Sequence, residues 1–250
     1  MPYLGSTPAR GLVGTANIDD DAVTLAKIAS GTDGELITWD ASGNPAAVGA
    51  GSSGQFLKSQ GAGSVPVFAA ASSSFEFVSS TTASSSASVA LTGIDNTADT
   101  WMVLAEGVNP ATDGKQPWIR TSNDTSSHSY DSGASDYAWS FISAYGSSTT
   151  VYQKFDIADS EIQMGQDPLY PGNDATSAWS AKVFIHNPAD TTYHTIITYD
   201  ITQQATDQSS QRVIGSGQRK AAEAVTAIQF LMESGNIDSG KFSLFKIKHA

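Results

Sequence analysis

The sequence predicts a mainly β protein, in which an extended N-terminal arm and a hairpin linker precede an antiparallel β-sandwich with a jelly-roll-like fold. Three observations support this prediction. A short sequence unit is repeated between residues 34 and 68, and stretches at 69–74 and 79–88 are rich in Ala, Ser and Thr. After residue 88, short apolar segments are separated by turn residues. The composition of these stretches places a domain boundary near residue 72. We therefore expect an arm over 1–33, a duplicated Gly/Pro hairpin segment over 34–71 and a sandwich domain over 72–250.

The first segment has no core of its own. Residues 1–17 carry Gly, Pro and Thr with scattered apolar side chains, so the segment orders only against a partner, with Tyr3 and Leu4 as its anchors. Three aspartates at 19–21 then precede residues 22–29, where Lys27 near the end suits a short helix, although the apolar spacing fits neither a helix nor a strand. The aspartates lack the alternating spacing and the Gly of a calcium loop, so no metal is predicted there.

The duplicated unit defines the second segment. Residues 34–37 match residues 54–57, and Val48 matches Phe68 at the same offset, while Pro45 and Pro66 slip by one. Each copy predicts a β-hairpin, with its turn at 41–44 or at 61–64. A unit this short cannot bury its own apolar face, so it packs against its twin, the following domain or another chain. We expect the last of these, and hence a homo-oligomer.

The sandwich is predicted from apolar periodicity. Residues 100–105 form a nearly continuous apolar run, and alternating large residues mark strands at 137–145 and 179–185. A turn at 187–190 leads into a strand at 193–201, and strands at 225–232 and 242–247 are separated by turns at 235–236 and 239–240. The predicted core residues are Trp101, Val103, Phe141, Val183 and Ile197.

The net charge and the absence of cysteine limit the classes of partner and of chemistry that this chain can have. The formal net charge of −12 disfavours nucleic acid, and the absence of cysteine removes disulfides and thiol chemistry. We read no signal peptide and no apolar run of membrane-spanning length, so we expect synthesis in the cytoplasm and no membrane insertion.

The sequence gives little support for catalysis or a cofactor. Residues 49–54 match the dinucleotide pattern G-x-G-x-x-G, but no helix follows them, so they are interpreted as linker. His186 and His194 flank one predicted hairpin without a third metal ligand, and the carboxylates at 156–161 are interpreted as a solvated acidic loop. No serine-hydrolase motif is present. We predict no catalytic residue, no metal and no cofactor.

Aromatic side chains are the candidate ligand-binding residues, because sugar rings stack on flat aromatic faces. Four aromatics lie in or beside polar, turn-rich sequence: Trp118, Tyr130, Tyr170 and Trp179. The alternative for each is a place in the sandwich core.

Several segments resemble fibre proteins of tailed bacteriophages: residues 2–11, 18–29, 34–45, 51–59 and 66–68. Residues 235–247 resemble the last strand of phage adhesin domains, although Phe245 and Lys246 stand where those domains carry Tyr and Gly. The resemblance implies a trimer in the virion, attached through the N-terminal arm to a phage tail, adaptor or capsid protein. The arm residues that it implicates are Tyr3, Leu4, Pro8 and Arg10.

The same resemblance implies a function for the C-terminal domain, the recognition of a host cell-surface polysaccharide. A head (capsid) fibre or decoration appendage with a structural role is the alternative. A polysaccharide-degrading enzyme is the third hypothesis.

Overall fold

The computed structural model describes residues 30–71, 73–165 and 170–248, together with residues 16, 18, 19, 22 and 23. These residues contain sixteen β-strands and no α-helix. The predicted mainly β fold is therefore confirmed. The chain divides into two compact units, Met1–Ser72 and Ser73–Ala250, and each is described by itself below.

The first unit contains two antiparallel hairpins. Strand β1 (Leu36–Trp39) pairs with β2 (Pro45–Val48), and β3 (Gln55–Lys58) pairs with β4 (Val67–Ala70). Leu36 lies opposite Val48, whereas in the second hairpin it is Leu57, and not Phe56, that lies opposite Phe68. The pairing thus shifts by one residue between the copies, as the slipped prolines indicate.

The turns that enter the two hairpins repeat in atomic detail. The Glu35 carboxylate accepts a hydrogen bond from the Thr32 amide at 2.7 Å, and the Gln55 side-chain carbonyl accepts one from the Ser52 amide at 2.7 Å. Gly34 and its counterpart Gly54 both adopt left-handed backbone angles, with φ of 82° and 85°. The duplication is therefore structural as well as sequential.

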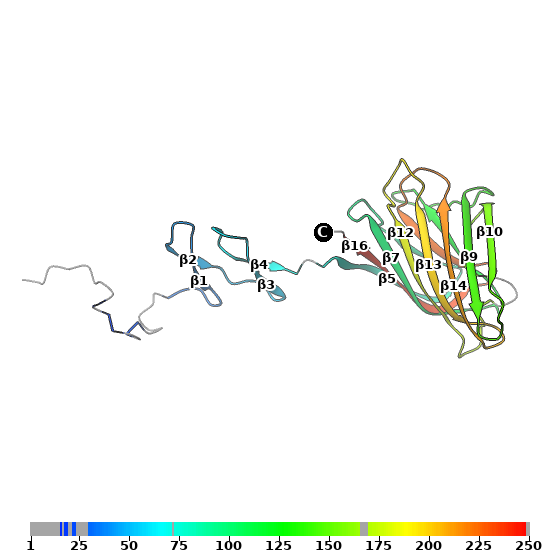
Figure 1. Cartoon of the computed structure of the whole chain (residues 1–250), viewed down its shortest axis with the longest axis horizontal. Coiled ribbons are helices and arrows are strands. Elements are labelled where there is room, and N and C mark those ends of the chain that lie inside the picture. The colour runs from blue at the N-terminus through cyan, green and yellow to red at the C-terminus, as the bar shows by residue number, and fades with distance from the viewer. Residues whose placement is uncertain are drawn as a thin grey trace, which may run out of the picture. The chain divides into compact units, whose positions relative to one another are not determined.

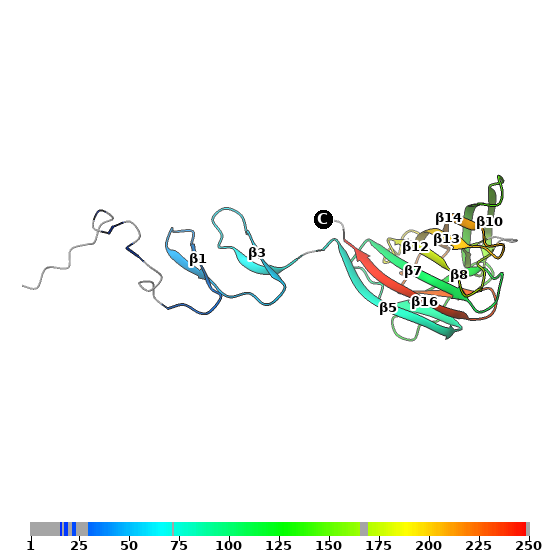
Figure 2. The ribbon, with the colours of Figure 1, turned by 90° about the horizontal axis from the view of Figure 1, so that it is seen from below.

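The second unit is a sandwich of two antiparallel sheets (Figures 1 and 2). In order across it, the eight-stranded sheet contains β10 (Tyr152–Asp159), β9 (Tyr137–Tyr145), β14 (Ser210–Arg219), β13 (Ile196–Gln204), β12 (Trp179–His186), β7 (Thr100–Pro110), β16 (Ile237–Ile247) and β5 (Phe75–Ser86). The four-stranded sheet contains β11 (Ile162–Gln163), β8 (Pro117–Ser122), β15 (Ala227–Met232) and β6 (Ser88–Thr92).

The strand order contains a jelly roll with two insertions. The orders β5-β16-β7-β12 and β6-β15-β8-β11 are those of the two four-stranded sheets of a jelly roll. The pair β9–β10 is inserted between β8 and β11, and the pair β13–β14 between β12 and β15. Both insertions extend the large sheet beyond β12, and Figure 1 shows these strands side by side up to β10.

The core lies between the two sheets. All five predicted core residues are buried there: Trp101, Val103, Phe141, Val183 and Ile197. Glycine is required at Gly215 of β14, because a Cβ would lie 2.3 Å from the hydroxyl oxygen of Tyr199. That hydroxyl donates to the backbone carbonyl of Gln163 at 2.7 Å. Tyr199 thereby ties the inserted strands to β11 of the small sheet.

Two sequence predictions about the sandwich are wrong in detail. The Ser/Thr-rich run at 79–88, for which no strand was predicted, belongs mostly to β5, which pairs along its length with β16 through its backbone. The predicted turn at 239–240 lies inside β16, at a register irregularity, although 235–236 does separate two strands. The strand expected at 193–201 begins at Ile196. Strands β6, β8, β10, β11 and β14 were not predicted.

Candidate functional site

The small sheet covers only one face of the large sheet, and the opposite face, here called the outer face, carries the candidate site. The two faces alternate along β13, where Ile197, Tyr199 and Ile201 are buried while Thr198 and Thr202 point the other way. Two regions of the outer face are hollowed, and their chemistry differs.

The first region is a polar groove made of three connected hollows. One of about 460 Å³ lies among Asn109, Thr176 and Asp238, and another of about 410 Å³ lies between Thr202 and Gln208. A third of about 200 Å³ is lined by charged side chains. The second hollow joins the other two, since it shares Ala178 with the first and Ser180 and Thr202 with the third. The polar and charged lining residues are Glu106, Asn109, Asn173, Thr176, Ser177, Ser180, Lys182, Asp200, Thr202, Gln203, Gln204, Gln208, Ser210, Asp238 and Ser239.

Strand irregularities create this groove. The pairing of β16 with β7 shifts twice between Ile237 and Lys241, and the pairing of β12 with β7 shifts between Trp179 and Ala181. Gly240 adopts a φ of 131°, and a Cβ there would lie 2.8 Å from the Cα of Val108. Bulges turn side chains away from regular alternation and bend the strands, so polar groups from three strands converge here.

Hydrogen bonds hold the groove walls in place. The Asn109 amide group donates to the backbone carbonyls of Asp174 at 3.0 Å and Ser177 at 2.6 Å, which fixes the loop before β12. Arg212 donates two hydrogen bonds to the Asp200 carboxylate, at 2.9 and 2.7 Å. The hydrogen bonds from Arg212 hold the pKa of Asp200 below its ordinary value, so this carboxylate stays charged. Thr202 remains exposed between the hollows.

The second region is apolar and lies on the inserted strands. We call it the β10 patch, and it consists of Ile142, Phe155, Ile157, Ile196 and Ile214, whose exposed fractions are 51%, 73%, 72%, 38% and 44%. Hollows of about 330 and 540 Å³ run along it, and both are floored by Ser140 and Ser216. Contiguous apolar surface of this kind on a folded domain marks an interaction site.

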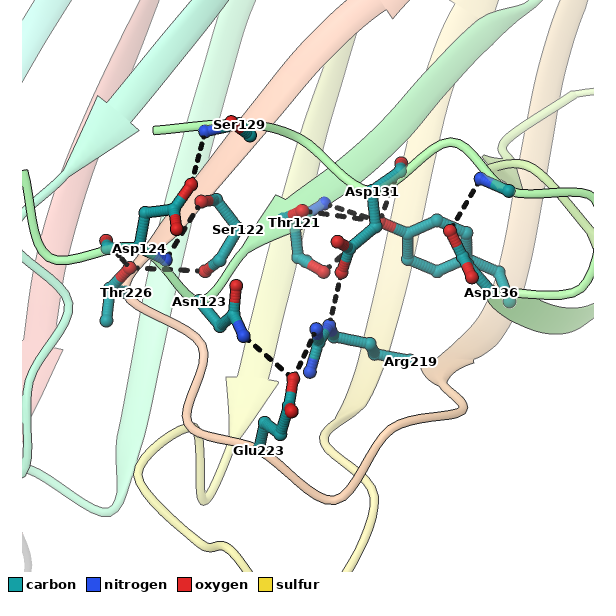
Figure 3. A network of polar contacts seen from close by, with 12 residues as sticks. Thr121, Ser122, Asn123, Asp124, Ser129, Asp131, Asp136, Arg219, Glu223 and Thr226 are labelled. Atoms are coloured by element: carbon teal, nitrogen blue, oxygen red, sulfur yellow. Dashed lines mark hydrogen bonds and ion pairs between the residues drawn. The ribbon is translucent and has the colours of Figure 1, made fainter. Parts of the chain in front are cut away.

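A network of polar contacts fixes the long loop between β8 and β9 (Figure 3). Arg219 is buried, and its guanidinium lies between the carboxylates of Asp131, at 2.5 Å, and Glu223, at 2.9 Å. The Tyr137 hydroxyl accepts a hydrogen bond from the Thr121 amide at 2.8 Å, and burial raises the pKa of Tyr137 to about 12. A buried cation between two carboxylates stabilises one loop conformation, so we assign this network a structural role.

The four aromatic candidates do not come together. Trp179 is 1% exposed and packs edge-on against Phe242, so its ring offers no face for stacking, and its selection as a ligand contact is not supported. Trp118 on β8, Tyr130 in the β8–β9 loop and Tyr170 after β11 are each half-buried, and none lines the polar groove.

The arm candidates Tyr3, Leu4, Pro8 and Arg10, and most of the possible helix at 22–29, lie outside the described residues. In the described part of the chain, no helix is long and apolar enough to span a membrane.

The residues considered for metal binding or acid–base chemistry occupy other places. Within the described residues, no cluster of three or more His, Cys, Asp or Glu side chains could hold a metal ion. His186 shares a hydrogen bond of 3.0 Å with the Thr198 hydroxyl, and burial lowers the pKa of His186. Glu161, predicted in a solvated loop, is instead buried and pairs with Arg120 at 3.1 Å.

The polar groove was missed because its residues are far apart in the sequence. Asn109, Ser180, Thr202 and Asp238 come from four different strands, and no local pattern connects them. A run such as the Asn-Pro-Ala-Thr that follows residue 108 shows only a polar turn.

Comparison with known proteins adds no relative, since no protein-family model, no curated protein and no solved structure matches this chain.

Proposed function

We propose that this chain is a virion fibre protein of a tailed bacteriophage, and that its sandwich binds a host cell-surface glycan through the polar groove. The support for the first part is the resemblance in residues 1–68, together with the duplicated hairpins that form the described part of that segment. On this proposal the chain works as a homo-oligomer, expected to be a trimer, held on the particle by its N-terminal arm.

The observation that carries the second part is the composition of the groove. Sugars present closely spaced hydroxyl groups, and amide, hydroxyl and carboxylate side chains at fixed positions match them. The groove offers these groups from Asn109, Thr176, Thr202, Gln208 and Asp238. Its walls are held by hydrogen bonds, so little ordering accompanies binding.

The glycan site proposed here replaces the aromatic residues selected from the sequence. Binding then depends mainly on hydrogen bonds and less on stacking, which favours recognition of the arrangement of hydroxyl groups along a polysaccharide.

The test is binding of the purified chain to whole host cells and to polysaccharide extracted from them. Thr202→Val removes a hydroxyl shared by two hollows and keeps the side-chain volume. Thr198→Val is the matched control, because Thr198 lies on the same strand and face but its hydroxyl bonds His186. We expect Thr202→Val to weaken binding about tenfold, the effect of one or two lost hydrogen bonds, and Thr198→Val to leave it unchanged.

Each outcome bears on a stated alternative. If the unaltered chain binds neither the cells nor the polysaccharide, yet is a component of the particle, the head fibre or decoration appendage replaces our proposal. Release of reducing sugar from the polysaccharide would instead show an enzyme. If Thr202→Val binds as tightly as the unaltered chain, or if both variants lose the same affinity, the proposal that the groove holds the glycan is wrong.

A further inference from the structure

The β10 patch and the groove are separate surfaces, and the patch carries an inference that is independent of the glycan proposal. Strand β10 is one edge of the large sheet, so no strand of the described residues lies beside the backbone groups on its outer side. It is also the most exposed strand of the inserted block, with Phe155 and Ile157 standing out on the outer face. Natural sheets protect such edges, because an open apolar edge pairs with another strand.

We infer that β10 pairs antiparallel with β10 of a second copy of this chain, about a two-fold axis at Phe155, and that Phe155 and Ile157 of the β10 patch are covered in this contact. A two-fold contact needs one self-complementary surface, and the charges of β10 provide it. A two-fold axis cannot relate the three chains of one trimer, so in the proposed fibre this contact joins chains of different trimers. With the axis at Phe155, Lys154 of each copy lies opposite Asp156 of the other. Both residues point to the same face of the strand, because they pair with Phe141 and Trp139 of β9.

The charges also exclude the neighbouring registers. An axis at Lys154 would place two lysines opposite each other, and an axis at Asp156 would place two aspartates opposite each other. Like charges directly opposite in an antiparallel pair are destabilising. Only the register centred on Phe155 gives opposite charges on both sides of the axis, and it also brings the two most exposed apolar residues of β10, Phe155 and Ile157, into the contact.

The position of the patch in the fold also favours a partner strand at β10. It lies entirely on strands β9, β10, β13 and β14, which are the two insertions into the jelly roll. The eight remaining strands complete a jelly roll without them. Insertions that extend a sheet and end in an open apolar edge are accounted for by a partner that continues the sheet.

The chain contains no cysteine, so single cysteines report the register directly. In the full-length protein, Phe155→Cys places two thiols at the axis, where opposed residues fall within the Cα separation that a disulfide requires. Gln153→Cys is the control on the same strand, because in this register the two copies of residue 153 lie roughly 14 Å apart. Mild oxidation followed by non-reducing electrophoresis measures the disulfide-linked pair.

We expect Phe155→Cys to cross-link about tenfold faster than Gln153→Cys, even if the hairpin arm also holds chains together, because the arm raises both rates equally. Equal rates, whether both fast or both slow, overturn the inference. A host or virion protein bound at the patch in place of a second copy would also give slow cross-linking, and would overturn it.

A charge exchange tests the register again. In the Phe155→Cys background, Lys154→Glu and Asp156→Lys each place like charges opposite each other and should slow cross-linking several-fold. The two substitutions together restore opposite charges and should restore the rate. If the double variant stays as slow as the single ones, the proposed register is wrong.

Discussion

Replacing Trp101 with alanine tests the whole arrangement of the sandwich core. Trp101 lies on β7 in the jelly-roll part of the large sheet and is 0% exposed. A tryptophan side chain buries roughly 200–250 Å², which at about 25 cal/mol per Å² corresponds to about 5 kcal/mol of transfer free energy. Partial collapse of the cavity recovers some of this, so we expect the free energy of unfolding to fall by about 3–5 kcal/mol.

Two local features adjust this value in opposite directions. The Trp101 indole nitrogen is buried without a hydrogen-bond partner among the described residues, so removing it relieves a desolvation cost. The ammonium of Lys246 lies 5.2 Å from the centre of the ring, and that attraction is lost. Trp101→Phe removes the unpaired nitrogen but keeps most of the apolar volume, so it should cost much less than Trp101→Ala.

The measurement is equilibrium unfolding in urea followed by circular dichroism. With a slope of about 2 kcal/mol per M, the midpoint for Trp101→Ala should fall by about 2 M. Tyr193→Ala is the control, since Tyr193 is 73% exposed in a loop of the same unit, and it should leave the midpoint unchanged. An unchanged midpoint for Trp101→Ala, or an equal fall for Tyr193→Ala, would refute the assignment of the core.

Three further outcomes are expected. Light scattering of the full chain should show an oligomer at micromolar concentration, and Trp39→Ser with Phe56→Ser should lower its mass, because both side chains are exposed on the hairpins; a monomeric unaltered chain contradicts this. Glu161→Gln should lower the free energy of unfolding by about 2 kcal/mol, because Glu161 is buried and the half-buried Arg120 loses its counter-charge; an effect below about 1 kcal/mol in urea unfolding would contradict this. Burial lowers the pKa of His186 in the folded state, so the unfolded state binds more protons once the pH falls below about 6.5, the ordinary pKa of histidine. His186 should therefore not reduce the free energy of unfolding above pH 6.5, and should reduce it progressively as the pH falls below that value. His186→Gln should reduce that fall between pH 7 and pH 5, and an identical pH profile in this variant would disprove the contribution.

Periodicity in the sequence was enough to locate two of the strands that face the core. In β9 and β12 apolar residues recur at every second position, because only one face of each strand meets the small sheet. The same alternation predicts that Trp179 is a core residue. It alternates with Ala181 and Val183, which are core residues, so its ring points inward with theirs.

The two edge strands of the large sheet lack this pattern for physical reasons. Strand β5 is an edge strand whose Ser and Thr side chains bury little, and it is held by backbone pairing with β16. Strand β10 is also an edge strand, and its apolar residues face outward. The sequence also does not show which charged residues form ion pairs, since Arg120 and Glu161 are 41 positions apart in the chain.

The placement of the two proposed surfaces makes them separable and mutually supportive. The polar groove is formed mainly by β7, β12 and β16 of the jelly roll together with β13, whereas the β10 patch is formed by the insertions. A groove of exposed hydroxyl and amide groups binds a single sugar segment weakly, because water competes for every hydrogen bond. Copies joined through β10 or through the hairpins present several grooves to one polysaccharide, and the second binding event then becomes intramolecular. Such linkage raises the overall affinity by about 10²–10⁴ without any new contact to the sugar. Substitutions in the patch should therefore weaken attachment to cells while leaving the affinity of each groove for a short oligosaccharide unchanged.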